Sequence, residues 1–149
     1  MALLDLIKED VVKVPLESVT KTDVIRELVD VLVKHGKIQD ADKACDAIMK
    51  RESLGSTGLE KGIAVPHAKT DQVKSLTLAM GVSPKGVDFQ AVDGQPSKLF
   101  FLMLAAPDQS GPHLEALAEI ARVTRSETFC RLLCSATSAR EVVGLFQED

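Results

Sequence analysis

Apolar residues recur at helical spacing in the first third of the chain and predict two helices there. The first begins at Thr20 or Thr22, whose hydroxyls suit an N-cap, and ends at His35–Gly36, where glycine permits a left-handed stop. The second runs from Asp40 to about Leu54–Gly55. The apolar faces of these two helices consist of Val24, Leu28, Val31, Leu32, Ala41, Ala44, Cys45, Ile48 and Met49.

Runs of apolar and β-branched residues predict strands. Val11–Leu16 contains a proline and is predicted as an edge strand, and Gly62–His67 as a strand that its proline stops, so that His67 lies just past the strand end. Leu76–Met80 alternates apolar with polar positions and predicts another strand, whereas Gly81–Gln95 is predicted to be mostly loop or hairpin. Leu99–Ala105 is apolar throughout, which indicates a central strand covered on both sides.

The last third of the chain predicts helices again. Ala106–Pro112 is rich in turn residues, and its proline suits the first position of a helix that begins with His113. Two more helices are predicted to begin at Ser126 and Ser138, and a short one at Leu3–Ile7. The inner face of the helix after the turn is predicted to consist of Leu114, Leu117, Ala118 and Ala121. Strands interleaved with helices predict an α/β layered fold with a mixed sheet, and residues 1–149 are predicted to form a single domain.

Composition narrows the class of protein. The formal net charge is −4 and the basic residues are interspersed with acids, so a nucleic-acid-binding surface is not expected. No apolar run reaches the roughly 20 residues of a membrane span, and the first ten residues do not resemble a signal peptide, so a cytoplasmic protein is predicted. The three cysteines do not form a CxxC pair and are predicted to be small buried apolar residues; they are Cys45, Cys130 and Cys134.

Two histidines stand at the ends of predicted elements. His67 follows a strand and His113 begins a helix after the most apolar strand, and sites in α/β sheets gather where strand ends meet helix N-termini. We therefore expect the two rings to face each other. A helix N-terminus attracts anions and lowers the pKa of an imidazole, and a neutral imidazole nitrogen is a competent nucleophile. Together with the guanidinium of Arg51 and the hydroxyls of Ser56 and Thr57, this set fits phosphoryl transfer to a histidine.

Other chemistries fit the residues less well but stay open at this stage. His67, His113 and Asp71 are possible metal ligands, although the HExxH motif is absent. A Ser–His hydrolase would need G-x-S-x-G, and direct ATP binding would need G-x-x-x-x-G-K-[ST]; the sequence contains neither. In the simplest alternative His67 is a loop histidine without a chemical role.

Three segments together resemble a known family. They are R-E-S-L-G-S-T-G-L at 51–59, G-I-A-V-P-H-A at 62–68 and P-H-L-E-A-L-A-E-I-A at 112–121. They are similar to the enzyme IIA domains of the fructose–mannitol class in the bacterial phosphoenolpyruvate-dependent sugar phosphotransferase system, a class that includes nitrogen-regulatory enzyme IIA. The resemblance runs nearly from end to end of the chain. It implies a single mixed β-sheet flanked by helices on both faces, as in mannitol enzyme IIA.

The resemblance also implies roles for particular residues. It implies that His67 is phosphorylated by the histidine phosphocarrier protein HPr or its nitrogen-branch relative, that His113 is the second active-site histidine, and that Arg51 is the active-site arginine. The residues that it would place at the phosphate pocket are Ser56, Thr57 and Glu60. No metal, nucleotide or other cofactor is expected in the transfer step.

The acceptor of the phosphoryl group differs between two branches of this family. In the sugar branch it is an enzyme IIB, which works with a membrane permease, so the chain would be peripheral to the membrane at most. In the nitrogen branch the protein is a regulatory module whose partners depend on its phosphorylation state. The sequence shows no IIB or permease segment, and its motifs are shared by both branches. Both functions therefore stay open.

Overall fold

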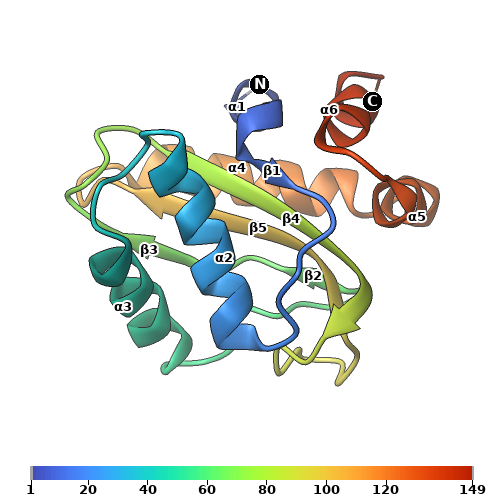
Figure 1. Cartoon of the computed structure of the whole chain (residues 1–149), viewed down its shortest axis with the longest axis horizontal. Coiled ribbons are helices and arrows are strands. Elements are labelled where there is room, and N and C mark those ends of the chain that lie inside the picture. Colours follow the sequence, from blue (N-terminus) through green and yellow to red (C-terminus); the bar gives the residue numbers. More distant parts are fainter. Residues whose placement is uncertain (1, 149) are drawn as a thin grey trace.

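A five-stranded mixed sheet forms the centre of the structure, a computed structural model that describes residues 2–148 (Figure 1). The strand order is β1-β4-β5-β2, and β3 also pairs with β5. The β4–β5 pair is antiparallel and the other pairs are parallel. The strands are β1 Val12–Lys13, β2 Ile63–Ala64, β3 His67–Lys69, β4 Thr77–Val87 and β5 Ser97–Ala105. The predicted α/β fold with a single mixed sheet is confirmed.

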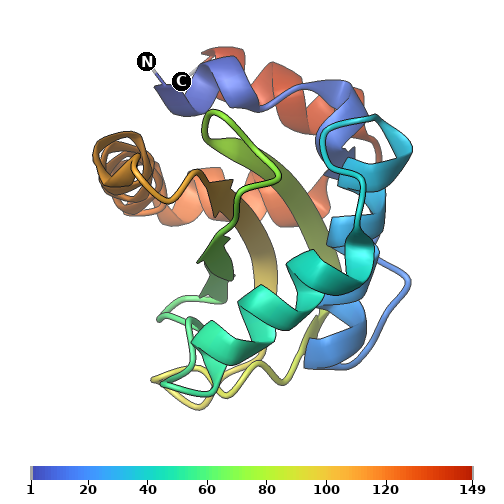
Figure 2. The same cartoon turned by 90° about the vertical axis from the view of Figure 1, so that its left-hand side faces the viewer.

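Helices cover both faces of this sheet, as predicted. Figures 1 and 2 show α2 and α3 on one face, and α1, α4, α5 and α6 on the other. Their bounds are α1 Ala2–Leu6, α2 Lys21–Lys34, α3 Ala41–Glu52, α4 Ser110–Val123, α5 Glu127–Ser135 and α6 Ala139–Glu148, with a 3-10 turn at Glu9–Val11.

Strand β5 divides the core into two apolar clusters. Phe100, Leu102 and Leu104 pack with α2 and α3, whereas Phe101 and Met103 pack with the helices of the opposite face. Alternate side chains of a strand point to opposite faces, so a strand that is apolar throughout must be covered twice. The prediction of a central strand at this position is confirmed. The predicted burial of the cysteines is met only in part, because Cys45, Cys130 and Cys134 are half-buried at the margins of the clusters.

The predicted starts of the two helices in the first third of the chain, and the end of the first, are confirmed, whereas the second helix ends at Glu52, about two residues before the predicted end. The hydroxyl of Thr20 accepts from the amide of Asp23 at 3.2 Å, and the carboxylate of Asp40 accepts from the amide of Lys43 at 3.0 Å. Gly36 has a φ of +72°, which is the left-handed conformation that ends α2. The hydroxyls predicted to open the last two helices also accept from amides three residues on; they belong to Ser126 and Ser138.

Gly81–Gln95 was predicted as mostly loop or hairpin, and its first half is strand, because β4 continues to Val87 and pairs antiparallel with β5. Glycine at position 81 leaves room for Leu16, since a Cβ there would lie 2.8 Å from the leucine side chain and would force it to shift. Beyond it the strand contains Pro84, and the pairing register with β5 shifts between Val82 and Val87. The irregular ladder accommodates the proline and glycine, which in sequence indicate a turn.

His67 also differs from its predicted place, since it begins β3 instead of lying past a strand end. Ile63 and Ala64 of β2 pair with Leu99 and Phe100, and β3 resumes the pairing with β5 at Met103. Pro66 lacks an amide donor, but its carbonyl still accepts from the amide of Met103 at 2.9 Å. The proline therefore interrupts the ladder without ending it.

Helix α4 begins three residues earlier than predicted, at Ser110, so that Pro112 occupies its third position. Proline is tolerated there because the first four amides of a helix have no intrahelical acceptor. The predicted inner face is also wrong: Leu114 is 64% exposed. The residues of α4 that are buried are Ala116, Glu119, Ile120 and Val123. Thus His113 lies in the first turn of α4, and Leu117 is left half-exposed beside a groove.

Candidate functional site

The two histidine rings face each other across the boundary between the sheet and α4. His67 lies on β3, and His113 lies in the first turn of α4. Their ring centroids are 4.6 Å apart, with an interplanar angle of 52°. The expected approach of the two rings is thus confirmed, because β3 lies next to β5 and the chain turns from β5 directly into α4.

A hydrogen bond fixes the orientation and tautomer of His67. Its Nδ1 lies 2.8 Å from the carbonyl oxygen of Val65. A carbonyl oxygen only accepts hydrogen bonds, so Nδ1 must carry the proton, and in the neutral ring Nε2 holds the lone pair. The half-buried ring of His67 therefore presents Nε2 as its nucleophilic atom.

His113 is held in its neutral form. Burial lowers the pKa of its imidazole below the ordinary value of 6.5, and the positive charges of His67 and Lys69 lower this pKa further. The ammonium of Lys69 is fixed at the start of α4 by donating to the hydroxyl of Ser110 at 3.0 Å. Among residues 2–148, the buried Nε2 of His113 has no hydrogen-bond partner. This nitrogen therefore keeps a hydrogen-bonding capacity that the described residues do not use.

The lowered pKa of His113 predicts a pH dependence of stability. The unfolded chain binds a proton at this residue near pH 6.5, whereas the folded protein binds it only at lower pH. Between these two pKa values the unfolded state binds more protons than the folded state. The stability that neutral His113 contributes is therefore complete above pH 6.5 and is lost as the pH falls through the pKa of the folded protein. Urea unfolding over this range should show a smaller pH dependence in His113→Gln, but not in a control, His35→Gln, at an exposed helix end. Equal pH dependence in all three proteins would contradict the assignment.

Arg51 lies on the last turn of α3, where its guanidinium donates to the carbonyl of Gly55 at 2.9 Å. No carboxylate among the described residues forms an ion pair with Arg51. Its positive charge is therefore uncompensated and suited to an anion. The loop that follows Arg51 is linked to His67 through Val65. The amide of Val65 donates to the carbonyl of Thr57 at 3.0 Å, and the carbonyl of Val65 accepts from His67.

The hydroxyls of Ser56 and Thr57, which were expected at the phosphate pocket, form hydrogen bonds inside the protein. Ser56 Oγ donates to the carbonyl of Phe89 at 2.6 Å and accepts from the amide of Gly58 at 3.0 Å. Thr57 is 4% exposed, and its hydroxyl donates to the carboxylate of Glu52. Both side chains therefore shape the turn after α3 through bonds within the protein.

Glu52 and Lys21 form a buried ion pair under this turn. The Nζ of Lys21 lies 2.8 Å from Oε1 of Glu52 and 4.7 Å from the centroid of the Phe89 ring. The same carboxylate accepts from the amide of Thr57 at 3.1 Å. This pair was not predicted from the sequence, although one signal was present: a carboxylate in the last turn of a helix is unfavourable with the helix dipole and needs a compensating partner.

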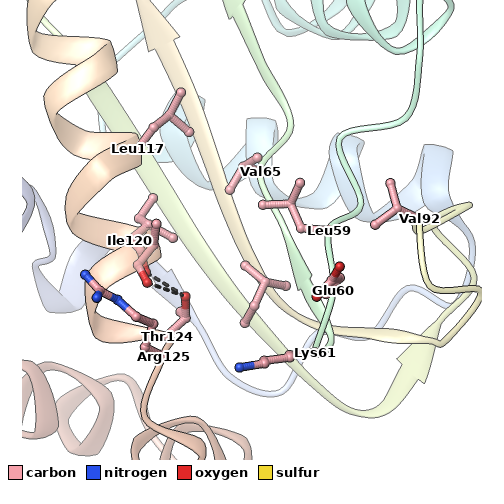
Figure 3. Close-up of a pocket in the computed structure, with 11 residues that line it drawn as sticks. Leu59, Glu60, Lys61, Val65, Val92, Leu117, Ile120, Thr124 and Arg125 are labelled. Carbon is pink, nitrogen blue, oxygen red and sulfur yellow. Dashed lines mark hydrogen bonds between the residues drawn. The ribbon is translucent and has the colours of Figure 1, made fainter.

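Glu60 lines an apolar groove that runs beside α4 (Figure 3). The groove has a volume of about 350 Å³ and lies between α4 and the chain segment 59–65. Val65, whose carbonyl orients His67, lines one wall, and Leu117, one turn beyond His113, lines the other. Glu60 therefore belongs to a surface that begins beside the two histidines.

Asp71, the third possible metal ligand, is engaged elsewhere. Asp71 forms an ion pair with Lys43 at 2.7 Å, and this contact lowers the pKa of Asp71. Within residues 2–148, no group of three or more His, Cys, Asp and Glu side chains is placed to hold a metal ion.

No helix in the described part of the chain combines the length and the apolar character that crossing a bilayer requires.

Comparison with known proteins places the chain among phosphotransferase proteins. It is 37% identical over 87% of its length to the fructose-specific EIIA component of Haloferax volcanii, of which it covers 84%. It is also 37% identical, over 99% of its length, to the fructose-specific EIIABC component of Bacillus subtilis, but it spans only 23% of that longer protein. The crystal structure of nitrogen regulatory protein IIA-Ntr from Neisseria meningitidis superimposes with a TM-score of 0.88 at 28% identity, covering 97% of this chain and 99% of that one.

The family described as "Phosphoenolpyruvate-dependent sugar phosphotransferase system, EIIA 2" matches residues 5–149. This match includes the two facing histidines, the arginine at the end of α3 and the groove beside α4. The chain therefore belongs to the EIIA 2 family of the phosphoenolpyruvate-dependent sugar phosphotransferase system.

Proposed function

We propose that this chain is a phosphocarrier in which His67 accepts a phosphoryl group from a protein of the HPr type and passes it to an enzyme IIB. Residues 1–149 would act as one EIIA domain in the cytoplasm. The observation that carries the proposal is the pairing of a His67 ring, held with Nε2 as its free nitrogen, with a neutral His113. Membership of the EIIA 2 family and the similarity to fructose-specific relatives support the sugar branch.

The transfer step follows from the tautomer of His67. The lone pair of Nε2 attacks the phosphorus atom, a new N–P bond forms, and the N–P bond to the donor histidine breaks with its electron pair returning to the donor ring. The ring of His67 gains positive character as the bond forms. The hydrogen bond from Nδ1 to the carbonyl of Val65 stabilises this charge and keeps the ring in place.

Catalysis of such a transfer depends mainly on positioning and on stabilising the negative charge of the phosphoryl oxygens. A neutral imidazole has one N–H group, so His113 would donate to a phosphoryl oxygen without forming an ion pair that holds it in place. The uncompensated guanidinium of Arg51 would supply positive charge. In this proposal Ser56 and Thr57 position the turn that carries Arg51, and Glu60 has no part in binding phosphate.

Reconstitution tests this function. The protein is incubated with phosphoenolpyruvate, enzyme I and HPr, and intact mass is followed with time. One phosphoryl group should be added, and it should be lost when a fructose-type enzyme IIB is supplied. The absence of any phosphoryl adduct with HPr and with its nitrogen-branch relative would reject the proposal.

His113→Ala should slow onward transfer to enzyme IIB more than it reduces the final extent of labelling. The reason is that His113 contributes orientation and charge stabilisation, whereas His67 supplies the nucleophile. Removal of one such donor typically lowers a rate by about 10²- to 10³-fold. Rapid-quench measurement of the transfer rate checks this expectation, with His35→Ala as the control. Equal onward rates in the wild type and in His113→Ala would remove His113 from the mechanism.

A second candidate function is that of a nitrogen-branch regulator. The observation that favours it is the TM-score of 0.88 with nitrogen regulatory protein IIA-Ntr over 97% of this chain. Phosphorylation of the same His67 would then change which partner binds, because it adds negative charge at a surface site. Parallel assays separate the two functions: sugar phosphorylation with a cognate enzyme IIB supports the carrier, and partner binding that depends on the phosphorylation state supports the regulator.

A further inference from the structure

The groove beside α4 continues into a second cavity away from the histidines. The first has a volume of about 350 Å³ and the second about 510 Å³. Both are lined by Lys61 and Thr124, so the two join at these residues. We call the first the apolar groove and the second the basic basin. The residues that line the basic basin besides these two are Lys98, Glu127, Cys130, Arg131, Cys134 and Ser135.

Hydrophobic side chains form the walls of the apolar groove: Val65 and Ile120 lie at its buried base, and Leu117, Leu59 and Val92 are more exposed. Figure 3 shows Leu117 and Ile120 of α4 facing Val65 and Leu59 across the gap, with the ammonium of Lys61 at the lower end. Leu59 is 41% exposed, and Val92 at the groove margin is 69% exposed. A contiguous apolar surface of this kind usually marks an interaction site, since exposing it to water is unfavourable.

The basic basin carries positive charge that the protein itself does not compensate. Three cations line it, Lys61, Lys98 and Arg131, against one carboxylate, Glu127. In the part of the chain that the structure describes, none of these four residues forms an ion pair. The chain as a whole has a formal charge of −4, so a local excess of positive charge selects for an anionic partner.

Two other charged residues of the apolar groove do not change this balance. The guanidinium of Arg125 points away from the groove, and Glu60 lies at the opposite margin from α4 (Figure 3). The surface therefore has two parts: an apolar channel that begins beside the histidines and a cationic end that is more distant from them.

We propose that the apolar groove and the basic basin bind an extended, acidic segment of a partner protein. Leucine, isoleucine, methionine or phenylalanine side chains of that segment would fill the groove between Ile120 and Leu59. Its carboxylates would pair with Lys61, Lys98 and Arg131. The groove begins at Val65 and Leu117, next to the two rings, so a phosphoryl group on His67 would repel an acidic segment and weaken its binding. This second effect rests on the proposed function, whereas the docking itself does not.

The docking is tested with a phage-displayed library of random peptides selected on the unphosphorylated protein of residues 1–149. Counter-selection uses a charge-reversal variant, K61E/K98E. The peptides enriched should combine Asp or Glu with bulky apolar residues. Fluorescence anisotropy of a labelled enriched peptide should show affinity about tenfold lower for K61E/K98E, the loss expected from two exposed ion pairs, and lower affinity at higher salt.

Matched variants keep the outcome interpretable. K34E/K74E makes the same change in net charge with exposed lysines outside the groove and basin, and should bind the peptide as the wild type does. Ala121→Phe fills the groove from an exposed position of α4 and should also weaken binding. Circular dichroism confirms that each variant is folded. Absence of enriched peptides, enrichment of basic peptides, or undiminished affinity in K61E/K98E would overturn the proposal.

A separate experiment tests the effect of phosphorylation on peptide binding. Protein phosphorylated by phosphoenolpyruvate, enzyme I and HPr should bind the peptide more weakly than the unphosphorylated form, and His67→Ala should bind it equally well with and without the phosphorylating mixture. If the protein takes no phosphoryl group, the proposed function fails while docking to the unphosphorylated protein is still measured. If phosphorylated protein binds the peptide as tightly as before, the regulatory part of this inference is wrong.

Discussion

Replacing His67 with alanine is expected to abolish acceptance of the phosphoryl group. In the proposed transfer step this side chain supplies the attacking nitrogen. The ring centroid of His113 lies 4.6 Å away, but its nitrogen Nε2 is buried, and in the part of the chain that the structure describes no carbonyl holds its ring as Val65 holds that of His67. Intact-mass analysis after incubation with phosphoenolpyruvate, enzyme I and HPr measures the effect.

Two further variants make this result specific. His67→Gln keeps a polar side chain of similar size and should also fail to be labelled, because an amide nitrogen is not a nucleophile. His35→Ala removes an exposed histidine at the end of α2 and should be labelled at the wild-type rate. Labelling of His67→Ala to the wild-type extent would show that another residue carries the phosphoryl group.

Glu52→Ala is expected to lower the free energy of unfolding by about 3–5 kcal/mol, the usual cost of breaking a buried ion pair by removing one partner. The side chain of Glu52 is 2% exposed and that of its partner Lys21 is 13% exposed. Alanine would leave this ammonium partly buried without a counter-charge and would remove the acceptor of the hydroxyl and the amide of Thr57. Urea unfolding followed by circular dichroism measures the loss.

The same substitution should also slow the labelling of His67 in the fraction of molecules that stay folded. Thr57 accepts from the amide of Val65, and the carbonyl of Val65 orients the imidazole. Glu52→Gln retains one acceptor oxygen and the side-chain volume, so it should cost less stability than alanine. If Glu52→Ala unfolds at the wild-type urea concentration, the ion pair does not contribute to stability as we describe.

The parts of the fold that were predicted from sequence are those determined by local pattern. The continuous apolar run of β5 requires burial on both faces, and the polar residues at Thr20 and Asp40 bond to amides three positions on. Each of these signals acts within a few residues. The local sequence was therefore sufficient to predict this strand and these helix starts.

The errors occurred where a distant segment determines the local structure. Pro84 and Gly86 indicate a turn by themselves, yet pairing with β5 extends β4 to Val87. Helix α4 begins at Ser110, whose hydroxyl accepts from Lys69 of β3, a contact between residues 41 positions apart that the local pattern does not indicate.

The candidate site was predicted where local signals mark its residues and was missed where distant residues pair. His67 and His113 stand beside a proline and a helix start, which are visible in the sequence. The ion pair between Lys21 and Glu52 joins residues 31 positions apart, and the place of Glu52 at a helix end indicates that it needs a cation without indicating which one. The groove beside α4 was not predicted at all, because it depends on which face of α4 packs against the sheet.

The central claim is that Nε2 of His67 is the atom that forms the N–P bond. Nitrogen-15 NMR of protein labelled at histidine, recorded before and after phosphorylation, observes each ring nitrogen directly. We expect a phosphorus–nitrogen coupling at Nε2 of His67, an Nδ1 of the same ring that stays protonated, and no such coupling at His113. A phosphoryl group on Nδ1 of His67, or on either nitrogen of His113, would contradict the account.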